Sequence, residues 1–500
     1  MVELAFFGGV NEIGGNKILL EDNGTRILLD FGLSFTLMKE YYDEYLQARS
    51  FGIIDEYVAF GLLPNLKGLY REDHLAHVSP RHPLMGSKHR KTAEAVVISH
   101  AHMDHVGLVP YLRPDIKLMG SETTHNILTY LQDTMDGDAQ EFCHWYPSFQ
   151  LVPLKRGQGM KRARRNDLED QKETREYINS SIDRPYQMGD IEIATYPVDH
   201  SLPGANAYIA KTGSGNIAYT GDLRFHGYGS DMTKKFLKSL EETDVTVLLC
   251  EGTRADEPLG LTEDTLRGDL TQVFDDTRKV VLVNYAARDT SRLLTLSKAA
   301  IASGRKLLIN PKQAYYLKVL RDGGESILPE EQDVSILLPR RGWGIWGDTS
   351  YDEKNRLEDY SYSYPKPIRE YMFEQSVLVT PQDVADAQSE YVVTCSFYEI
   401  NLLHDLKPAE GSCFVWSQSE PFDDESAIDF ARVKRWLRHF GLGEPLLKHC
   451  SGHMSGTEIR EFVERAQPEI VVPIHTEKSE LFKEWHADVR LMNYGDMLQV

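Results

Sequence analysis

The stretch AVVISHAHMDHVG, residues 95–107, decides the fold class of this chain. An apolar run that is typical of a buried strand ends at His100, and His102, Asp104 and His105 follow it closely. Two histidines two positions apart on an extended segment point the same way, whereas Asp104 and His105 come after the chain turns towards a helix. One short loop therefore offers ligands to two adjacent cations. Imidazole and carboxylate together suit Zn²⁺, with Mn²⁺ as the next choice because it accepts more oxygen ligands.

Three other strand-like runs end in residues that can complete such a site. YPVDHS presents His200, IAYTGDLRFHG presents Asp222, and EIVVPIHTEKS presents His475. As a set in this order, these residues predict a two-metal centre. Two divalent cations that share a water lower its pKa from ~15.7 towards ~7, so hydroxide is available at neutral pH. Hydrolysis is therefore the expected reaction, although the metals alone do not choose between ester, thioester, lactam and phosphodiester substrates.

The composition bounds the architecture. The chain has 500 residues, of which 41% are hydrophobic, so we expect two or three domains. Short β-branched and leucine-rich runs alternate with capped helical patterns, which predicts an α/β protein. The formal net charge of −21 excludes a generally basic nucleic-acid binder but leaves open a locally basic channel or a metal-centred site.

The chain carries no sign of secretion or of membrane insertion. Its start lacks the cationic and apolar regions of a signal peptide, and no apolar run approaches the ~18 residues of a membrane span. The five cysteines form no C-x-x-C pair, as is usual for reduced thiols. We therefore expect a soluble, cytoplasmic protein without a membrane partner, for which a homodimer is one expected assembly.

These motifs resemble the metallo-β-lactamase superfamily, with HAHMDH as its signature and GDLRF and a later histidine in the expected order. The resemblance implies an αββα sandwich. It also implies one metal held by three histidines and a second held by an aspartate and two histidines: respectively His100, His102 and His200, then Asp104, His105 and His475. Asp222 would bridge the two metals. Asp30, in RILLDFG, matches an early aspartate that would orient a ligand.

A long separation between two ligands predicts an inserted domain. The 252 residues between Asp222 and His475 far exceed what a compact metallo-hydrolase needs. We expect the first part of the metallo-β-lactamase domain over residues 1–257, the insert over 258–408, and the return over 409–500.

The stretch LLKHCSGHMSGTEIREFVERAQPEIVVPIH, residues 446–475, resembles the β-CASP nucleases, in particular their ribonuclease J branch. By this resemblance Glu251 is the motif A acid, which supports the centre, His453 the motif B histidine and His475 the motif C histidine. Ser455 and Glu458 form a capping box, which places His453 just ahead of a helix N-terminus in a loop suited to anions. Ser451, Gly452 and Ser455 are accordingly expected to bind the scissile phosphate.

Several basic or aromatic features carry a weaker signal. Arg254 and Arg288 are candidates for backbone phosphate contacts, with ordinary surface ion pairs as the alternative. The basic stretch 155–165, KRGQGMKRARR, predicts a surface excursion that is either a solvated charged helix with no partner or a patch for a polyanion. The aromatic-rich stretch 341–371 predicts a long loop whose rings either stack on bases or pack on their own domain.

The resulting prediction is a metal-dependent phosphodiesterase that hydrolyses single-stranded RNA, by 5′-to-3′ exonuclease action, internal cleavage or both. Asp104, Asp222 and His453 are the expected catalytic residues, with His453 stabilising or protonating the leaving oxygen. Two alternatives stay open at this point. One is a DNA nuclease of the same fold, and the other is a hydrolase of small esters or lactones whose insert acts as a lid.

Overall fold

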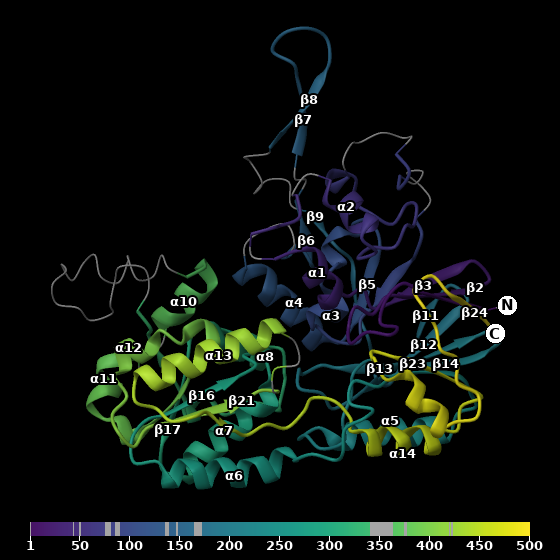
Figure 1. The fold of residues 1–500 in the computed structure, drawn as a ribbon. Helices are drawn as coiled ribbons and strands as arrows, with labels where there is room; N and C mark the ends of the chain where they lie inside the picture. Colours follow the sequence, from purple (N-terminus) through teal and green to yellow (C-terminus); the bar gives the residue numbers. More distant parts are fainter. Residues whose placement is uncertain are drawn as a thin grey trace.

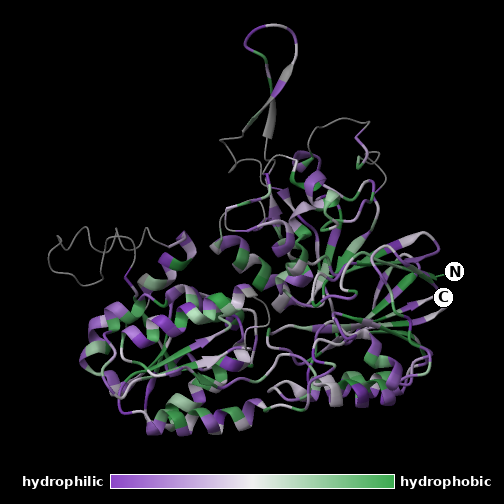
Figure 2. Ribbon diagram, in the orientation of Figure 1, coloured by the Kyte–Doolittle hydropathy of each residue, from purple (hydrophilic) through white to green (hydrophobic). Residues whose placement is uncertain are grey.

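Three large sheets with helices on their faces organise the chain (Figure 1). The computed structural model describes residues 2–43, 45–49, 52–75, 82–85, 91–135, 140–146, 149–164, 173–340, 364–374, 378–419, 421 and 424–500. Hydrophobic residues gather on the strands, as the green colour in Figure 2 shows.

The first sheet mixes parallel and antiparallel strands. In spatial order its strands are β10 (Tyr177–Asn179), β5 (Lys117–Gly120), β4 (Ala95–Val97), β3 (Thr25–Leu29), β2 (Ile18–Asp22), β1 (Val2–Phe6) and β24 (Met497–Gln499). The β10 to β3 part is parallel, and β3, β2, β1 and β24 then pair antiparallel. The N-terminal strand β1 therefore lies beside the C-terminal strand β24.

The second sheet carries the later ligand positions. In spatial order its strands are β11 (Tyr186–Met188), β12 (Ile191–Pro197), β13 (Asn206–Thr212), β14 (Gly215–Tyr219), β15 (Val245–Glu251) and β23 (Ile470–Ile474). β14, β15 and β23 run parallel, so their carboxyl ends reach the same edge.

The first two sheets pack face to face with helices outside. Leu29 and Val97 of the first sheet share one buried cluster with Tyr208 and Leu249 of the second. The outer face of the first sheet is covered by α2 (Ile53–Ala59) and α4 (Glu122–Thr134), and that of the second by α5 (Ser230–Glu241) and α14 (Gly456–Ala466). This confirms the predicted αββα sandwich. Helix α14 follows the predicted cap, because Ser455 and Glu458 form the capping box.

The third sheet is entirely parallel. In spatial order its strands are β19 (Leu378–Val379), β18 (Val334–Leu337), β17 (Lys306–Ile309), β20 (Tyr391–Thr394), β16 (Val281–Tyr285), β21 (Cys413–Ser417) and β22 (Leu446–Leu447). One face packs on α6 (Glu263–Asp276), α7 (Thr290–Ala302), α8 (Pro311–Asp322) and α10 (Lys366–Glu374). The other packs on α11 (Pro381–Asp386), α12 (Leu402–Leu406) and α13 (Asp424–His439). Cover on both faces explains the unbroken apolar runs of its strands.

The chain leaves the third sheet later than predicted. The return was expected at residue 409, but β21 pairs with β16, and β22 pairs with β21. The segment that returns to the second sheet therefore starts after Leu447. The run CFVW, residues 413–416, falls within the predicted return but forms β21 of the third sheet. Its sequence could not show this, because a strand buried on both faces carries no pattern that indicates which sheet it joins. The boundary predicted at residue 258 lies between β15 and α6.

Smaller elements complete the described chain. Residues 155–164 of the basic stretch lie on a hairpin of β7 (Phe149–Pro153) and β8 (Met160–Arg164), which projects from the sandwich as the predicted excursion (Figure 1). These residues form a strand and a turn, so the helix of the solvated alternative was wrong. Residues 341–363 of the aromatic stretch lie outside the described residues, whereas Tyr364 and Tyr371 are buried. The remaining elements are α1 (Phe35–Tyr41), α3 (Met103–Val106), β6 (His144–Trp145), β9 (Glu173–Thr174) and the 3₁₀ turns η1 (Glu72–His74), η2 (Val109–Tyr111), η5 (Glu331–Asp333), η6 (Gln388–Glu390), η7 (Phe397–Glu399) and η8 (Ser479–Glu484). Among the described helices, none has the length and apolar character to cross a membrane.

Candidate metal centre

The predicted ligands converge from the ends of strands in the first two sheets. His100 and His102 follow β4, His200 follows β12, Asp222 follows β14, and His475 follows β23. These side chains, with Asp104 and His105 from α3, form two ligand groups that share Asp222. Within each group, the candidate ligand atoms lie within 4.8 Å of one another.

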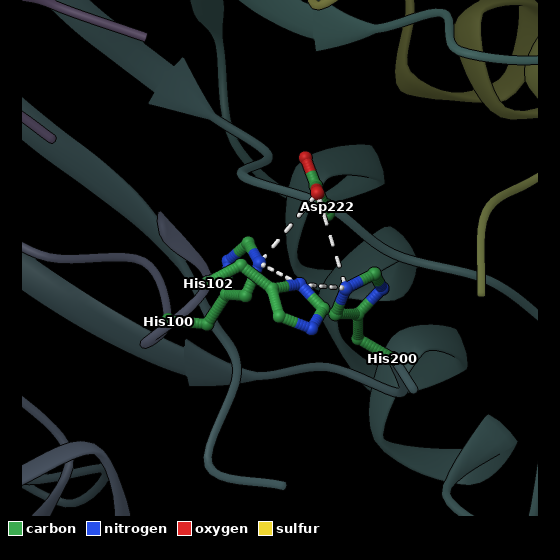
Figure 3. A group of neighbouring side chains, drawn as sticks. All are labelled: His100, His102, His200 and Asp222. Atoms are coloured by element: carbon green, nitrogen blue, oxygen red, sulfur yellow. Dashed lines mark hydrogen bonds and ion pairs between the residues drawn. The ribbon is translucent and has the colours of Figure 1, made fainter. Parts of the chain in front are cut away.

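The first group contains His100, His102, His200 and Asp222, which point towards one another in Figure 3. His102 Nδ1 lies 2.9 Å from His100 Nε2 and 3.1 Å from His200 Nε2. Asp222 Oδ2 lies 3.6 Å from His100 Nε2 and 3.9 Å from His200 Nε2. Three imidazoles and one carboxylate thus face a common point, which is the donor number of a tetrahedral zinc site.

The second group contains Asp104, His105, Asp222 and His475. Asp222 Oδ2 lies 3.2 Å from His105 Nε2 and 3.6 Å from His475 Nε2. Asp104 Oδ2 lies 3.2 Å from His475 Nε2. The same oxygen of Asp222 therefore faces both groups, which is the geometry that a bridging carboxylate needs.

The carboxylate of Asp30 contacts His105 of the second group on the side away from the centre. It is fully buried and lies 2.7 Å from His105 Nδ1 through Oδ2. Asp30 also accepts hydrogen bonds from Ser99 N and Ser99 Oγ at 2.7 and 2.6 Å, and from the Tyr219 hydroxyl at 2.5 Å. A bond to Nδ1 leaves Nε2 of His105 directed at the centre. These are the contacts that the orienting role predicted for Asp30 requires.

Glu251 and Thr253 support the other side of the centre. Glu251 is fully buried, and its Oε1 lies 3.3 Å from His453 Nδ1. The Thr253 hydroxyl donates to Glu251 Oε2 at 2.8 Å and lies 2.9 Å from His475 Nδ1 and 3.1 Å from His453 Nδ1. Sequence reasoning missed Thr253. Its position two residues after the motif A acid, at the same strand end, was the available signal.

Burial and neighbouring charges set the protonation of the histidines. Burial lowers the pKa of His100 and His200 well below the ordinary value, and lowers that of His102 to about 4. Neutral imidazole is the form that binds metal ions. For His105, burial is outweighed by the Asp222, Asp30 and Asp104 carboxylates, which raise its pKa well above the ordinary value.

The donor set fits divalent cations. His105 Nε2 and Asp222 Oδ1 are buried, and neither has a hydrogen-bond partner among the described residues. Buried polar atoms are almost always paired, so the unpaired His105 Nε2, which faces Asp222 Oδ2 at 3.2 Å, indicates a ligand at this place. The neutral imidazoles of the first group and the ionised carboxylates of Asp104 and Asp222 supply lone pairs for it. A divalent metal ion is the group that matches this chemistry.

Two backbone features occur around the metal centre: a glycine that packs against Asp104, and two residues with unusual dihedral angles. A Cβ added at Gly32 would lie 1.6 Å from the Asp104 carbonyl oxygen, so no larger residue fits there. Asp30 and His475 adopt φ angles of 56° and 52°, a left-handed conformation that is rare outside glycine. Such conformations concentrate at functional sites, where the surrounding structure holds them.

The motif B loop, residues 451–455, lies beside the first ligand group. Its residues make different kinds of contact. Gly452 O lies 2.7 Å from His200 Nδ1, and Ser451 Oγ accepts the His453 N–H at 3.2 Å. Ser455 is fully buried, and its hydroxyl donates to Glu458 Oε2 at 2.9 Å within the capping box. The phosphate contact predicted for Ser455 therefore conflicts with its structural use as a cap.

The two predicted arginines also differ. Arg254 pairs with Glu257 at 2.8 Å and donates to the His453 carbonyl at 3.4 Å, so its guanidinium is held beside the motif B loop. Arg288 Nη1 is buried without a hydrogen-bond partner among the described residues. The positive charge of Arg288 also contributes to the lowered pKa of His102, which places it near the first ligand group.

A buried ion network joins the motif B loop to the third-sheet part of the chain. Arg292 of α7 donates to Glu263 Oε1 at 3.1 Å, to the Ser417 carbonyl at 2.8 Å and to the Cys450 carbonyl at 2.7 Å. Arg224, two residues after Asp222, donates to the Ser451 carbonyl at 2.9 Å. Sequence reasoning missed this network, because nothing in the sequence marks a buried arginine.

Several known proteins are similar in sequence to this chain. A family model described as "Zn-dependent metallo-hydrolase RNA specificity domain" matches residues 447–487, which include the motif B loop and His475. Ribonuclease J of Mycobacterium tuberculosis (strain H37Rv) is 26% identical over 60% of this chain and 43% of that protein. Ribonuclease J of Corynebacterium glutamicum is 24% identical over 94% of this chain and 53% of that protein. The chain spans about half the length of these curated relatives.

A solved structure shows the same fold over the whole length. The crystal structure of a protein of unknown function from Enterococcus faecalis V583 has a TM-score of 0.69 and 20% sequence identity, and the match covers 99% of each chain. The ribonuclease J matches confirm the resemblance to ribonuclease J-like proteins that the motifs predicted, and the solved structure supports the fold.

Proposed function

We propose that this chain is a metal-dependent phosphodiesterase that hydrolyses single-stranded RNA. The observation that carries the proposal is the pair of buried ligand groups sharing Asp222, with His453 held at their rim. The matches to ribonuclease J proteins and to an RNA specificity domain support RNA as the polymer.

We propose two divalent ions for this centre, with Zn²⁺ first and Mn²⁺ second. His100, His102 and His200 would hold one ion, and Asp104, His105 and His475 would hold the other, with Asp222 between them. Bound divalent cations lower the pKa of a coordinated water and neutralise charge that develops on phosphoryl oxygens. The nitrogen-rich first group favours Zn²⁺, whereas the two carboxylates of the second also suit Mn²⁺.

His453 is the proposed group on the leaving side of the reaction. Glu251 and Thr253 contact its Nδ1, which fixes the ring and leaves Nε2 for the substrate. Burial disfavours a charged His453, but the Glu251 and Asp222 carboxylates outweigh burial and raise its pKa. A protonated His453 can donate a hydrogen bond or a proton to the departing oxygen. Its side chain is 21% exposed, so substrate can reach it.

Substrate phosphates have a cationic partner beside the centre in Arg288. Its unpaired Nη1 and its position near His102 support a contact with the RNA backbone. The motif B loop would contribute partly exposed polar groups at Ser451 and Gly452. Arg254, which is already paired with Glu257, would act chiefly by holding the His453 carbonyl. A homodimer and a cytoplasmic site of action stay predictions.

The test is degradation of single-stranded RNA by protein that has been loaded with Zn²⁺ or Mn²⁺. RNA labelled at its 5′ end and RNA labelled at its 3′ end distinguish stepwise removal of nucleotides from internal cleavage. DNA of matched sequence is run in parallel, because a site that depends on the 2′-hydroxyl leaves DNA intact. Cleavage of DNA in preference to RNA would overturn the choice of polymer.

Two variants separate this function from hydrolysis of a small molecule. Asp222→Ala removes the shared ligand and should abolish RNA cleavage. His453→Ala keeps both ligand groups and should still lower the cleavage rate by about 100-fold or more, as expected for loss of a general acid. Hydrolysis of a small ester or lactone that survives His453→Ala, in a protein that leaves RNA intact, would contradict the proposal.

A further inference from the structure

The order of strands in the third sheet creates two crevices at its carboxyl edge. The connections that leave β16, β17 and β18 lead towards the β19 side, whereas those that leave β20 and β21 lead towards the β22 side. The chain therefore diverges between β17 and β20, and again between β16 and β21. In open parallel sheets, ligands bind outside the carboxyl ends of strands at such points of divergence.

A cavity lies at each of these two places. The cavity of about 380 Å³ after β16 and β21 is lined by Asp289 and Ser417, and also by Gly452 of the motif B loop, so it belongs to the metal centre. The cavity of about 450 Å³ after β17 and β20 is lined by Asn310 and Glu399. Its lining includes no residue of the two ligand groups, and its volume falls in the ~300–1,000 Å³ range of small-molecule sites.

The second of these cavities, which we call the β17/β20 cavity, is built on a fixed polar frame. Asn310 donates to Glu399 Oε1 at 2.8 Å, and the Ser396 hydroxyl donates to Glu399 Oε2 at 2.8 Å. Asn310 also caps helix α8, because its side chain accepts the Gln313 N–H at 2.9 Å. These bonds join the ends of the two diverging strands, so the floor of the cavity is already ordered.

Three charged residues in its lining have no ion-pair partner among the described residues. Lys312, Arg340 and Asp405 line the cavity. Their charged groups form no ion pair with any side chain in the part of the chain that the structure describes. Two cations and one carboxylate suit a ligand that carries both an anion and hydrogen-bond donors, rather than a bare polyanion.

Aromatic rings also line the cavity. Trp436 and Tyr398 line the cavity, and the Tyr398 side chain is 89% exposed. An exposed ring at a cavity mouth is a stacking surface for a planar base. Tyr398 also lines the cavity at the metal centre, so the two crevices meet at this residue.

We propose that the β17/β20 cavity binds a ribonucleotide, at a site separate from the metal centre. Lys312 and Arg340 receive the phosphate, Tyr398 stacks on the base, and Asp405 accepts a hydrogen bond from the ribose hydroxyls. The inference goes beyond the proposed function, since binding here needs neither metal nor cleavage. The ribonucleotide is either free in solution or one unit of an RNA strand that passes Tyr398.

The experiment is calorimetric titration of the full chain, kept metal-free with a chelator. AMP tests the free ligand, dAMP tests the ribose hydroxyl, and a non-cleaved RNA dodecamer tests the strand. We expect AMP or the dodecamer to bind, and we expect dAMP to bind more weakly than AMP where the free nucleotide binds. Saturable binding of the mononucleotide identifies the free ligand, whereas binding of the dodecamer alone identifies the strand.

Variants assign the binding to this cavity. Lys312→Ala and Tyr398→Ala should each weaken the affinity by about tenfold, as expected for one charge-assisted bond and for one stacked base respectively. Lys306→Ala is the control for the lysine, because Lys306 is exposed at the opposite end of β17. Tyr45→Ala is the control for the tyrosine, because Tyr45 is also 89% exposed. Both controls should bind as the unaltered protein does.

Asp405→Asn gives a readout that a general structural defect does not produce. With AMP, or with matched RNA and DNA dodecamers, it should reduce the preference for the ribose form while leaving the deoxyribose form unaffected. Absence of all binding, or binding that Lys312→Ala and Tyr398→Ala leave unchanged, would overturn the inference. RNA cleavage by the metal-loaded protein in that case would leave the proposed function standing, so the two failures are distinguishable.

Discussion

Replacing Arg292 by methionine should destabilise the protein more than almost any other single change to a charged residue. Arg292 is 1% exposed and pairs with Glu263, which is equally buried. Methionine keeps most of the length and volume of the side chain but removes every hydrogen bond of the guanidinium. The Arg292→Met variant therefore leaves the Glu263 carboxylate with Arg224 as its remaining charged partner, at 3.5 Å.

The magnitude follows from these lost contacts. Breaking a buried ion pair by removing one partner costs about 3–5 kcal/mol. Here the Glu263 carboxylate stays in the interior with the longer pair to Arg224 as its charged contact. The carbonyls of Ser417 and Cys450 also lose their donors from Arg292, each at a cost of about 1–3 kcal/mol if no water replaces it. We expect a loss of at least about 3–5 kcal/mol in the free energy of unfolding of the part that contains α7.

Urea unfolding followed by tryptophan fluorescence and by circular dichroism measures this loss. Arg465→Met is the matched control, since Arg465 pairs with Glu241 at 2.7 Å while remaining 47% exposed, and such pairs contribute roughly 0.2–1 kcal/mol. Adding Glu263→Gln to Arg292→Met should recover part of the loss, because it removes the buried carboxylate charge that has lost its pair with Arg292. A loss below about 1 kcal/mol, equal to that of the control, would refute the reasoning.

Three further outcomes are expected. Thr253→Val should weaken metal binding by about 10- to 100-fold, measured by competition with a chromophoric chelator, whereas Thr253→Ser should retain it because the hydroxyl is kept. Removal of bound metal by a chelator should lower the melting temperature of the protein, and Asp222→Asn should make the melting temperature insensitive to the chelator; equal sensitivity in both proteins would argue against the site. Burial lowers the pKa of Lys17 from 10.5 to about 8, so between these pH values the unfolded chain holds a proton that the folded chain has lost. Stability should therefore rise with pH across this window, by an amount on the order of 3 kcal/mol, and urea titrations of Lys17→Met should lack this rise.

The candidate metal ligands could be predicted from the sequence because each stands at or shortly after the end of an apolar run. A polar residue that directly follows a buried strand is exposed to the sheet edge, and several such residues in a recognisable order define one place in space. Asp30 and Glu251 also end apolar runs, but their supporting roles came from the family resemblance. The apolar runs thus locate the seven ligand candidates, and the resemblance adds the two supporting carboxylates.

Contacts that join distant elements were beyond the sequence. Thr253, Arg224 and Arg292 act through hydrogen bonds to residues far along the chain. Thr253 follows the motif A acid and Arg224 lies in GDLRF, but no sequence pattern indicates the distant partners that these side chains contact. The order of strands in the third sheet was hidden for a similar reason, since parallel strands buried on both faces look alike. The strand β21 was accordingly assigned to the wrong sheet, and the divergence of the chain between β17 and β20 could not be foreseen.

The position of His475 directly after β23 has a consequence for biosynthesis. β23 is made after every strand of the third sheet, and it pairs with β15, which was made before any of them. A nascent chain can therefore complete the third sheet while one ligand group still lacks its last member and the motif C strand is missing from the sandwich. The proposed metal centre can therefore be completed only after His475 has been synthesised and has left the ribosome.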